Sequence, residues 1–192
     1  MRTRSLAAAV LMVAPFALAG TYGFAHGSSD QSAAQRAADV TSPPQADVRP
    51  FEHAKLSLVQ AVTDAQKEMR GNILAARFEL WNGQPSYLIR TYTSNEIWQE
   101  RVDANTGQPI GQPSSIPQSQ LSTRLQQNVT ALQNVKTNFV DAVANAEQKQ
   151  GGKAIMAAVE ARPDGAVSYK LDLVKHNHLQ VAMVDAENGQ LR

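Results

Sequence analysis

Apolar residues recur with a helical period after Phe51 and then with a period of two. One stripe of a helix is predicted by the apolar residues Leu56, Val59, Val62 and Met69. Gly71 is expected to end that helix. Three runs rich in strand-forming residues follow at 73–81, 86–92 and 97–104. Turn residues such as Asn82-Gly83 separate them, so this stretch predicts a helix packed on an antiparallel sheet.

The same order of patterns returns in the C-terminal part of the chain. Phe139, Val143 and Ala146 lie on one helical stripe, which Gly151-Gly152 ends. The expected strands are 154–162, 167–174 and 179–186. Asp164-Gly165 supplies the first turn between them.

Self-comparison explains why the order repeats. A shift of 81 residues aligns seven identities, including Ala76 with Ala157 and Glu79 with Glu160, and a shift of 82 aligns eight more. Chance would give about three matches over this length. We therefore expect an α+β protein of two repeated units, 51–112 and 133–192, each a helix on an antiparallel sheet of three to four strands.

The segment between the units is expected to be a helical linker over 113–132. It continues one apolar stripe through Leu121, Leu125, Val129, Leu132 and Phe139. A single long helical segment would then join the two units.

The N-terminus predicts export. Arg2 and Arg4 precede an uncharged apolar run, Leu6 to Ala19, which is too short for a confident membrane span. Residues 1–25 are interpreted as a signal peptide and the polar, Pro-containing residues 26–50 as a disordered tether. A periplasmic or secreted protein without a stable membrane anchor is expected, and with no Cys in the chain its fold depends on its cores alone.

Composition argues against two classes of partner. Without Arg2 and Arg4, 16 basic residues face 17 acidic ones, and they form no basic cluster. Nucleic-acid binding and attachment to acidic membranes both need such a cluster, so neither is expected. The oligomeric state does not follow from composition.

A motif that occurs twice carries a family resemblance. Val102-Asp103-Ala104 and Val184-Asp185-Ala186 are each followed by a Gly-Gln pair, after a helix with paired alanines and a Gly-turn-Tyr hairpin. This arrangement resembles the PepSY domain, and the chain resembles tandem PepSY proteins of the bacterial envelope. The resemblance implies a binding or regulatory role, such as modulation or inhibition of a peptidase.

The motif itself has two interpretations. Asp103 and Gly107 resemble part of a calcium loop, but no distal Glu follows at the required spacing. Asp103 and Asp185 are instead expected to accept backbone hydrogen bonds in a structural turn, with Gly107 and Gly189 at positive φ.

Candidate chemistry is sparse. His176 and His178 are weak metal-ligand candidates, because residues two apart on a strand face the same side. A metal-responsive sensor or buffer that uses them with turn carboxylates is the alternative function. No catalytic motif occurs, so no enzymatic activity, catalytic residue or cofactor is expected.

The predicted interaction surface lies on the open face of the first sheet. Strand alternation turns Trp81, Leu88 and Tyr92 outward, and Trp98 extends this patch. Large aromatic residues of this kind mark partner-binding sites. The alternative is that the patch is buried inside the protein, against the linker helix or the second unit.

Export makes a direct prediction about the mature chain. Small residues favour cleavage after Ala19 or Ala25, so the mature N-terminus should be Gly20 or His26. Mass spectrometry of the exported protein measures this. An intact Met1 on that form would contradict the signal-peptide interpretation.

Overall fold

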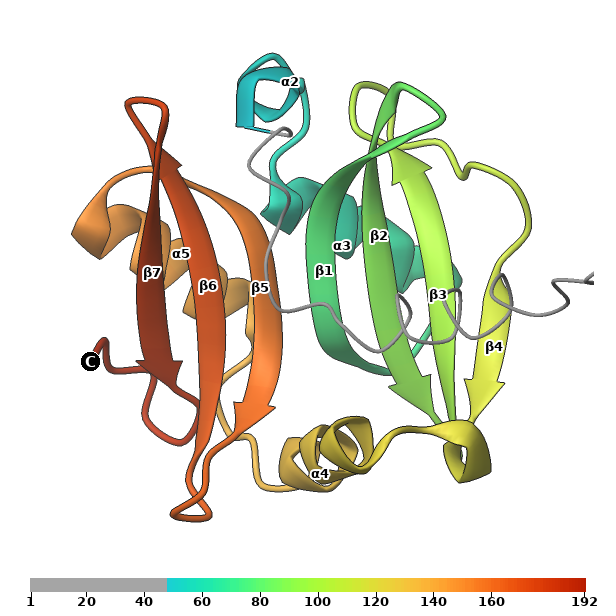
Figure 1. The fold of residues 1–192 in the computed structure, drawn as a ribbon, viewed down its shortest axis with the longest axis vertical. Helices are drawn as coiled ribbons and strands as arrows, with labels where there is room; N and C mark the ends of the chain where they lie inside the picture. Colours follow the sequence, from blue (N-terminus) through green and yellow to red (C-terminus); the bar gives the residue numbers. More distant parts are fainter. Residues whose placement is uncertain (1–47) are drawn as a thin grey trace, which may run out of the picture.

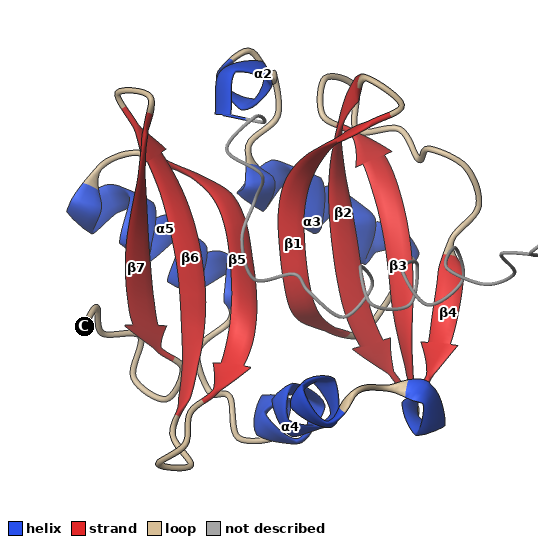
Figure 2. Cartoon of the chain, viewed as in Figure 1, coloured by secondary structure: helices blue, strands red, loops and turns tan. Residues whose placement is uncertain are grey.

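The computed structural model describes residues 48–192, and these form an α+β fold built on one antiparallel sheet of seven strands (Figures 1 and 2). The strands lie in the order β4-β3-β2-β1-β5-β6-β7. In chain order, the helices and strands are α2 (Val48–Glu52), α3 (Leu58–Glu68), β1 (Asn72–Trp81), β2 (Gln84–Thr93), β3 (Glu96–Asp103), β4 (Ser114–Pro117), the 3₁₀ helix η2 (Gln118–Gln120), α4 (Thr123–Leu132), α5 (Phe139–Gln150), β5 (Lys153–Ala161), β6 (Val167–Lys175) and β7 (His178–Asp185).

The expected strands are present, but they do not form two separate sheets. β1 and β5 pair through three positions, Ala75↔Ala158, Ala76↔Ala157 and Arg77↔Met156, and this pairing makes the sheet continuous. The centre of the seam is the pair Ala76–Ala157, whose members are equivalent in the sequence alignment. Hydrogen bonding between two edge strands leaves neither edge exposed at this point.

Helices α3 and α5 lie side by side on one face of the sheet (Figure 1). Ser57 caps the N-terminus of α3 with a capping box. Its side chain accepts a hydrogen bond from the Gln60 backbone N–H, and the Gln60 side chain accepts one from the Ser57 backbone N–H. Asn138 caps α5 by accepting from the Val140 N–H at 2.8 Å. Alanines form much of the buried stripe of each helix, which lets the two helices and the sheet approach closely: Ala61, Ala65, Ala142 and Ala146.

The segment between β3 and α5 differs from the single long helix that was expected. It begins with strand β4, continues through η2, and forms the separate helix α4, which ends at Leu132. A turn at 133–138 then precedes α5, where the Lys136 and Thr137 N–H groups bond to the Ala186 carbonyl at 3.0 and 2.9 Å. The apolar stripe does not require a continuous helix, because Leu121, Leu125 and Val129 are buried with the helix interrupted.

The N-terminal boundaries also change slightly. The signal peptide and residues 26–47 of the tether lie outside the described residues. Residues 48–50, assigned to the tether, begin α2, and Val48 is buried. No helix within 48–192 is both long and apolar enough to cross a membrane.

A buried tyrosine contacts a phenylalanine behind each half of the sheet, although one phenylalanine is on β1 and the other on α5. Phe78 contacts Tyr87 edge to face with ring centroids 5.6 Å apart, and Phe139 contacts Tyr169 at the same separation. The Tyr87 hydroxyl donates to the Leu56 carbonyl at 2.7 Å, and the Tyr169 hydroxyl donates to the Thr137 carbonyl at 2.7 Å. Burial raises the pKa of both phenols, so each is a neutral donor.

Removing either hydroxyl should have a similar cost. Tyr87→Phe and Tyr169→Phe each leave a carbonyl without this donor while keeping the ring packing, so each should lower the free energy of unfolding by about 1 kcal/mol. Urea unfolding followed by fluorescence measures this. Tyr92→Phe, which loses a bond from a half-buried hydroxyl to Gln118, is the matched control and should cost less. A loss confined to one of the two core tyrosines would contradict their equivalence.

Candidate functional site

The face of the sheet opposite α3 and α5 carries the charged residues of the central strands. We call it the open face. Pairing places Arg77, Leu88 and Arg101 in one row across β1, β2 and β3, and Ala75, Arg90 and Gln99 in the next. Because directly paired residues share a face, strand register alone brings these three arginines together.

Glu79 connects two of the arginines. Its Oε1 accepts from Arg101 Nε at 2.7 Å and its Oε2 from Arg77 Nη2 at 2.9 Å. The Arg101 guanidinium also lies 3.7 Å from the centre of the Trp81 ring, a cation–π contact. We call Arg77, Glu79, Arg90, Arg101 and Trp81 the arginine cluster; it contains three guanidinium groups and one carboxylate.

Arg90 is the buried member of this cluster. It is 2% exposed, and its Nε donates to Gln99 Oε1 at 3.2 Å. Burial, followed by the positive charges of Arg77 and Arg101, lowers the pKa of Arg90 to about 10, and Glu79 opposes the shift. Arg90 therefore remains charged at neutral pH, and its charge is held in a poorly solvated place.

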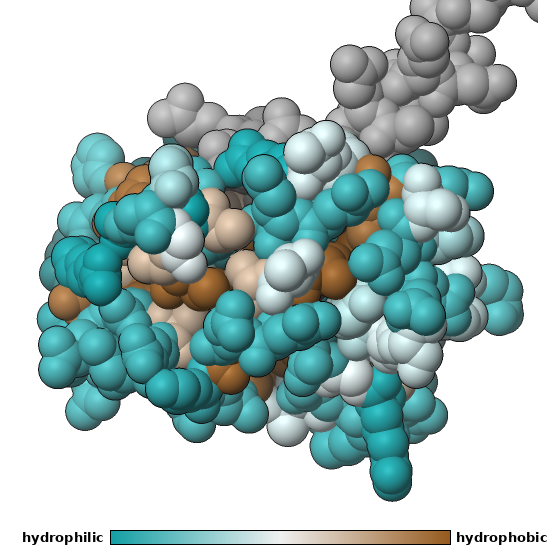
Figure 3. Space-filling view, turned by 90° about the horizontal axis from the view of Figure 1, so that it is seen from below, coloured by the Kyte–Doolittle hydropathy of each residue, from teal (hydrophilic) through white to brown (hydrophobic). Residues whose placement is uncertain are grey.

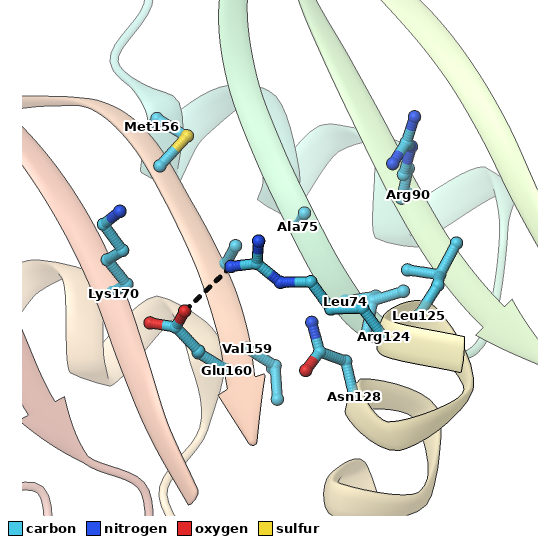
Figure 4. Close-up of a pocket in the computed structure, with 11 residues that line it drawn as sticks. Leu74, Ala75, Arg90, Arg124, Leu125, Asn128, Met156, Val159, Glu160 and Lys170 are labelled. Carbon is cyan, nitrogen blue, oxygen red and sulfur yellow. Dashed lines mark hydrogen bonds and ion pairs between the residues drawn. The ribbon is translucent and has the colours of Figure 1, made fainter. Parts of the chain in front are cut away.

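A small cavity lies on the open face where β1 and β5 separate. Helix α4 fills this gap and contacts both strands. Figure 4 shows Arg124 reaching from α4 toward Glu160 of β5, and their ion pair measures 2.9 Å. The cavity measures about 40 Å³, room for about one water molecule. Its lining combines apolar groups with cations: Leu74, Ala75, Leu125, Met156, Arg90, Arg124 and Lys170.

The two sequence-equivalent glutamates thus have different partners. Glu79 pairs with arginines of its own sheet, whereas Glu160 pairs with Arg124 from the segment between the two halves. The Asn128 side chain on the same helix accepts from the Ala161 N–H at 3.0 Å and covers the edge of β5 beyond its pairing with β1. In this way α4 closes the second half of the open face at its lower end.

The structure separates the four predicted partner-binding residues. Trp81 is 41% exposed, whereas Leu88, which lies in register between Arg77 and Arg101, is only 4% exposed. Tyr92 is half-buried, and its hydroxyl bonds to Gln118 of η2 at 3.2 Å. The prediction for Trp98 is wrong: it pairs with Thr91 and lies on the α3 side of the sheet, not on the open face.

Leu80 lies on the same side of the sheet as Phe78, as strand alternation requires, yet it is 38% exposed. It stands near the β1–β2 turn, beyond the buried part of the strand.

The side of the molecule on which α4 lies is mainly hydrophilic. Figure 3 views this side from below and shows apolar residues only as patches between hydrophilic ones. Continuous apolar surfaces of the kind that mark large interfaces are therefore not present in this view.

The two Asp-containing motifs form turns. Asp103 Oδ1 accepts from the Asn105 and Thr106 N–H groups, both at 2.8 Å. Asp185 Oδ1 accepts from the Glu187 and Asn188 N–H groups at 2.9 and 3.2 Å. Gly107 and Gly189 have φ of 74° and 70°, which favour glycine.

Hydrogen bonding lowers the pKa of both turn carboxyls. The Gln84 side chain is the largest cause for Asp103, and the Glu187 backbone N–H is the largest for Asp185. Both groups are therefore ionised acceptors held by the turn. These are the hydrogen bonds expected of a structural motif.

The histidine pair lies at the β6–β7 hairpin. His176 and Asn177 have positive φ, and His176 and His178 are both exposed. Within residues 48–192, no group of three or more His, Asp or Glu side chains is placed to hold a metal ion. The metal-responsive alternative remains a prediction from the sequence.

Sequence reasoning missed the arginine cluster. Arg90 follows Arg77 by 13 residues and Arg101 follows Arg90 by 11, so the three form no cluster along the sequence. One signal is present in the sequence: strand alternation turns Arg77 and Arg90 to the same face of neighbouring strands. The register of β3, which brings Arg101 into the same row as Arg77, follows only from the fold.

Comparison with known proteins adds little. No family model and no curated protein matches the chain. Among solved structures, the fold is similar to one from Clostridium difficile 630 described as a "putative lipoprotein", with a TM-score of 0.43 and 16% sequence identity over 72% of this chain and 91% of that chain.

The differing partners of Glu79 and Glu160 give a prediction about stability. Glu79→Gln removes the charge that two partly buried arginines share, so it should lower the free energy of unfolding by about 1–3 kcal/mol. Glu160→Gln is the matched control; its partner Arg124 is more exposed, and the loss should stay below about 1 kcal/mol. Urea unfolding at neutral pH measures both. Equal losses would contradict the bridging role of Glu79.

Proposed function

We propose that this protein is an exported, non-enzymatic binding or regulatory protein of the PepSY type. It acts in the periplasm or after secretion and engages a protein partner, such as a peptidase that it modulates or inhibits. The partner binds on the open face, at the arginine cluster.

Repeated features of the two halves support the PepSY part of this proposal. The Tyr87 and Tyr169 hydroxyls bond to equivalent backbone positions before α3 and α5, and Asp103 and Asp185 organise equivalent turns. The Ala76–Ala157 pair lies at the centre of the seam. A duplicated unit with one inward-facing strand edge on each copy accounts for all three observations.

One observation carries the binding part of the proposal: the exposed Trp81 ring held by Arg101. Exposed large apolar groups are uncommon among residues 48–192, and Trp81 is the largest of them. Its ring is held by a guanidinium that is itself fixed by Glu79, so little side-chain entropy is lost when a partner binds. Trp and Arg dominate the energetics of known interfaces.

Charge indicates the chemistry of the partner. The cluster has three guanidinium groups and one carboxylate, and the side chains of Arg77 and Arg101 are 18% and 28% exposed, so an acidic segment that also presents an apolar side chain fits it best. The second half of the open face differs, because Glu160 is paired with Arg124 and α4 occupies the lower end. Binding is therefore expected on the first half, at β1–β3.

The test compares two tryptophans on opposite faces. Trp81→Ala should reduce capture of the partner from envelope extracts by at least tenfold, because it removes the exposed ring and the surface on which Arg101 stacks. Trp98→Ala is the matched control, since it removes an indole from the α3 side of the same sheet. Quantitative crosslinking and affinity capture with both folded variants measure the difference, and thermal unfolding verifies their fold.

The outcomes separate the parts of the proposal. Unchanged capture by folded Trp81→Ala would reject the arginine cluster as the site. Equal losses in both variants would place binding elsewhere or indicate a general loss of structure. A captured peptidase whose activity is unaffected by the protein would reject the inhibitory role while leaving binding in place.

A further inference from the structure

The outer edge of β7 carries backbone groups with no strand beside them. The Met183 carbonyl accepts from the Arg192 N–H at 2.9 Å, and the Asp185 N–H donates to the Gln190 carbonyl at 2.8 Å. The odd-numbered residues of β7 therefore turn their backbone groups outward. Leu179 and Val181 do so as well, and no strand within residues 48–192 pairs with them on that side.

The equivalent edge in the first half is covered. There the chain after β3 makes the same return, with a bridge between Val102 and Pro109 that matches the bridge between Val184 and Leu191. It then continues into β4, which pairs with β3 over Glu96 to Gln99. In the sequence alignment, these positions correspond to His178–Val181, the uncovered part of β7.

The uncovered edge also lacks the features that prevent strand addition. Between His178 and Val184 there is no Lys, Arg, Pro or Glu, and β7 has no bulge in its pairing with β6. Val181 is 61% exposed, more than the other exposed large apolar side chains of the described chain. β7 is the last strand at one side of the sheet, and α5 lies behind the sheet there (Figure 1).

We propose that β7 pairs with β7 of a second copy of this chain. The strands run antiparallel about a two-fold axis through Gln180, which joins two seven-stranded sheets into one. Leu179 of one copy then lies opposite Val181 of the other, and each such pair exchanges two backbone hydrogen bonds. Gln180 faces Gln180 of the second copy, and His178 faces Ala182.

Self-complementarity favours a second copy over an unrelated strand. In this register an apolar residue meets an apolar residue on the open face, and no like charges are opposed. The register also stops before Met183, whose outward carbonyl is already bonded to Arg192. The pairing covers His178–Ala182, close to the span that β4 covers on β3.

The size of this interface predicts its strength. A strand pair this short buries less than the roughly 1,600 Å² of a standard interface. We therefore expect weak association, visible at high micromolar protein concentration. This inference does not depend on the arginine cluster and stands apart from the proposed partner.

A cysteine scan tests the register, because the chain contains no native Cys. Facing residues of a non-hydrogen-bonded pair have Cα atoms about 4.5 Å apart, within disulfide range. Gln180→Cys should therefore form a covalent dimer on mild oxidation. Val181→Cys is the matched control. In this register the two copies of residue 181 are offset by two residues, so their Cα atoms lie beyond the roughly 7 Å limit for a disulfide, and this variant should crosslink at least tenfold more slowly.

Sedimentation velocity over a range of concentrations tests the association itself. Val181→Pro removes an outward N–H without breaking the β6–β7 ladder, so it should abolish self-association while the protein stays folded. Val181→Thr keeps that N–H, so this variant should still self-associate. Monomer at all concentrations, equal crosslinking of the two cysteine variants, or unchanged association of Val181→Pro would each overturn the proposal. The proposal would also be overturned if β7 paired with a different protein and not with a second copy of this chain.

Discussion

The backbone pairing of β1 with β5 is the contact on which the rest of this structure depends. It involves only three residue pairs, and small side chains dominate it: Ala75 and Ala76 meet Ala158 and Ala157. Small residues at the seam, together with the alanines of α3 and α5, allow the two helices to lie close together behind the sheet. Larger side chains there would separate the helices and open the core, since interiors are packed without spare volume.

The shortness of the seam determines what is found on the open face. Because β1 and β5 pair over three positions only and then diverge, a gap is left that α4 fills with Leu125 and closes with the Arg124–Glu160 ion pair. Among residues 48–192, no such helix lies over the first half. There Glu79 holds Arg77 and Arg101, Arg101 stacks on Trp81, and the side chains of these two arginines are partly exposed.

The two halves also differ in how their outer strands end. Strand β3 is covered by β4, but His178–Ala182 of β7 has no strand on its outer side among the described residues. The molecule therefore presents two unlike surfaces: a charged aromatic one at β1–β3 and an uncharged backbone edge at β7. Strand edges and exposed aromatic residues recruit partners by different physical means, since the first uses main-chain hydrogen bonds and the second uses desolvation of side chains.

Sequence by itself determined the local elements of this protein. The period of the apolar residues gave helices near 58–68 and 139–150, and the turn residues gave the strand boundaries to within a few positions, because both depend on contacts between near neighbours. Strand alternation likewise placed Trp81 outward. Only the tertiary structure decided that the strands form one sheet, that β4 and α4 replace a long helix, that Arg101 joins Arg77, and that Trp98 faces α3. These features depend on strand register and on packing between distant segments. The local pattern of a single sequence does not specify which strand pairs with a given edge.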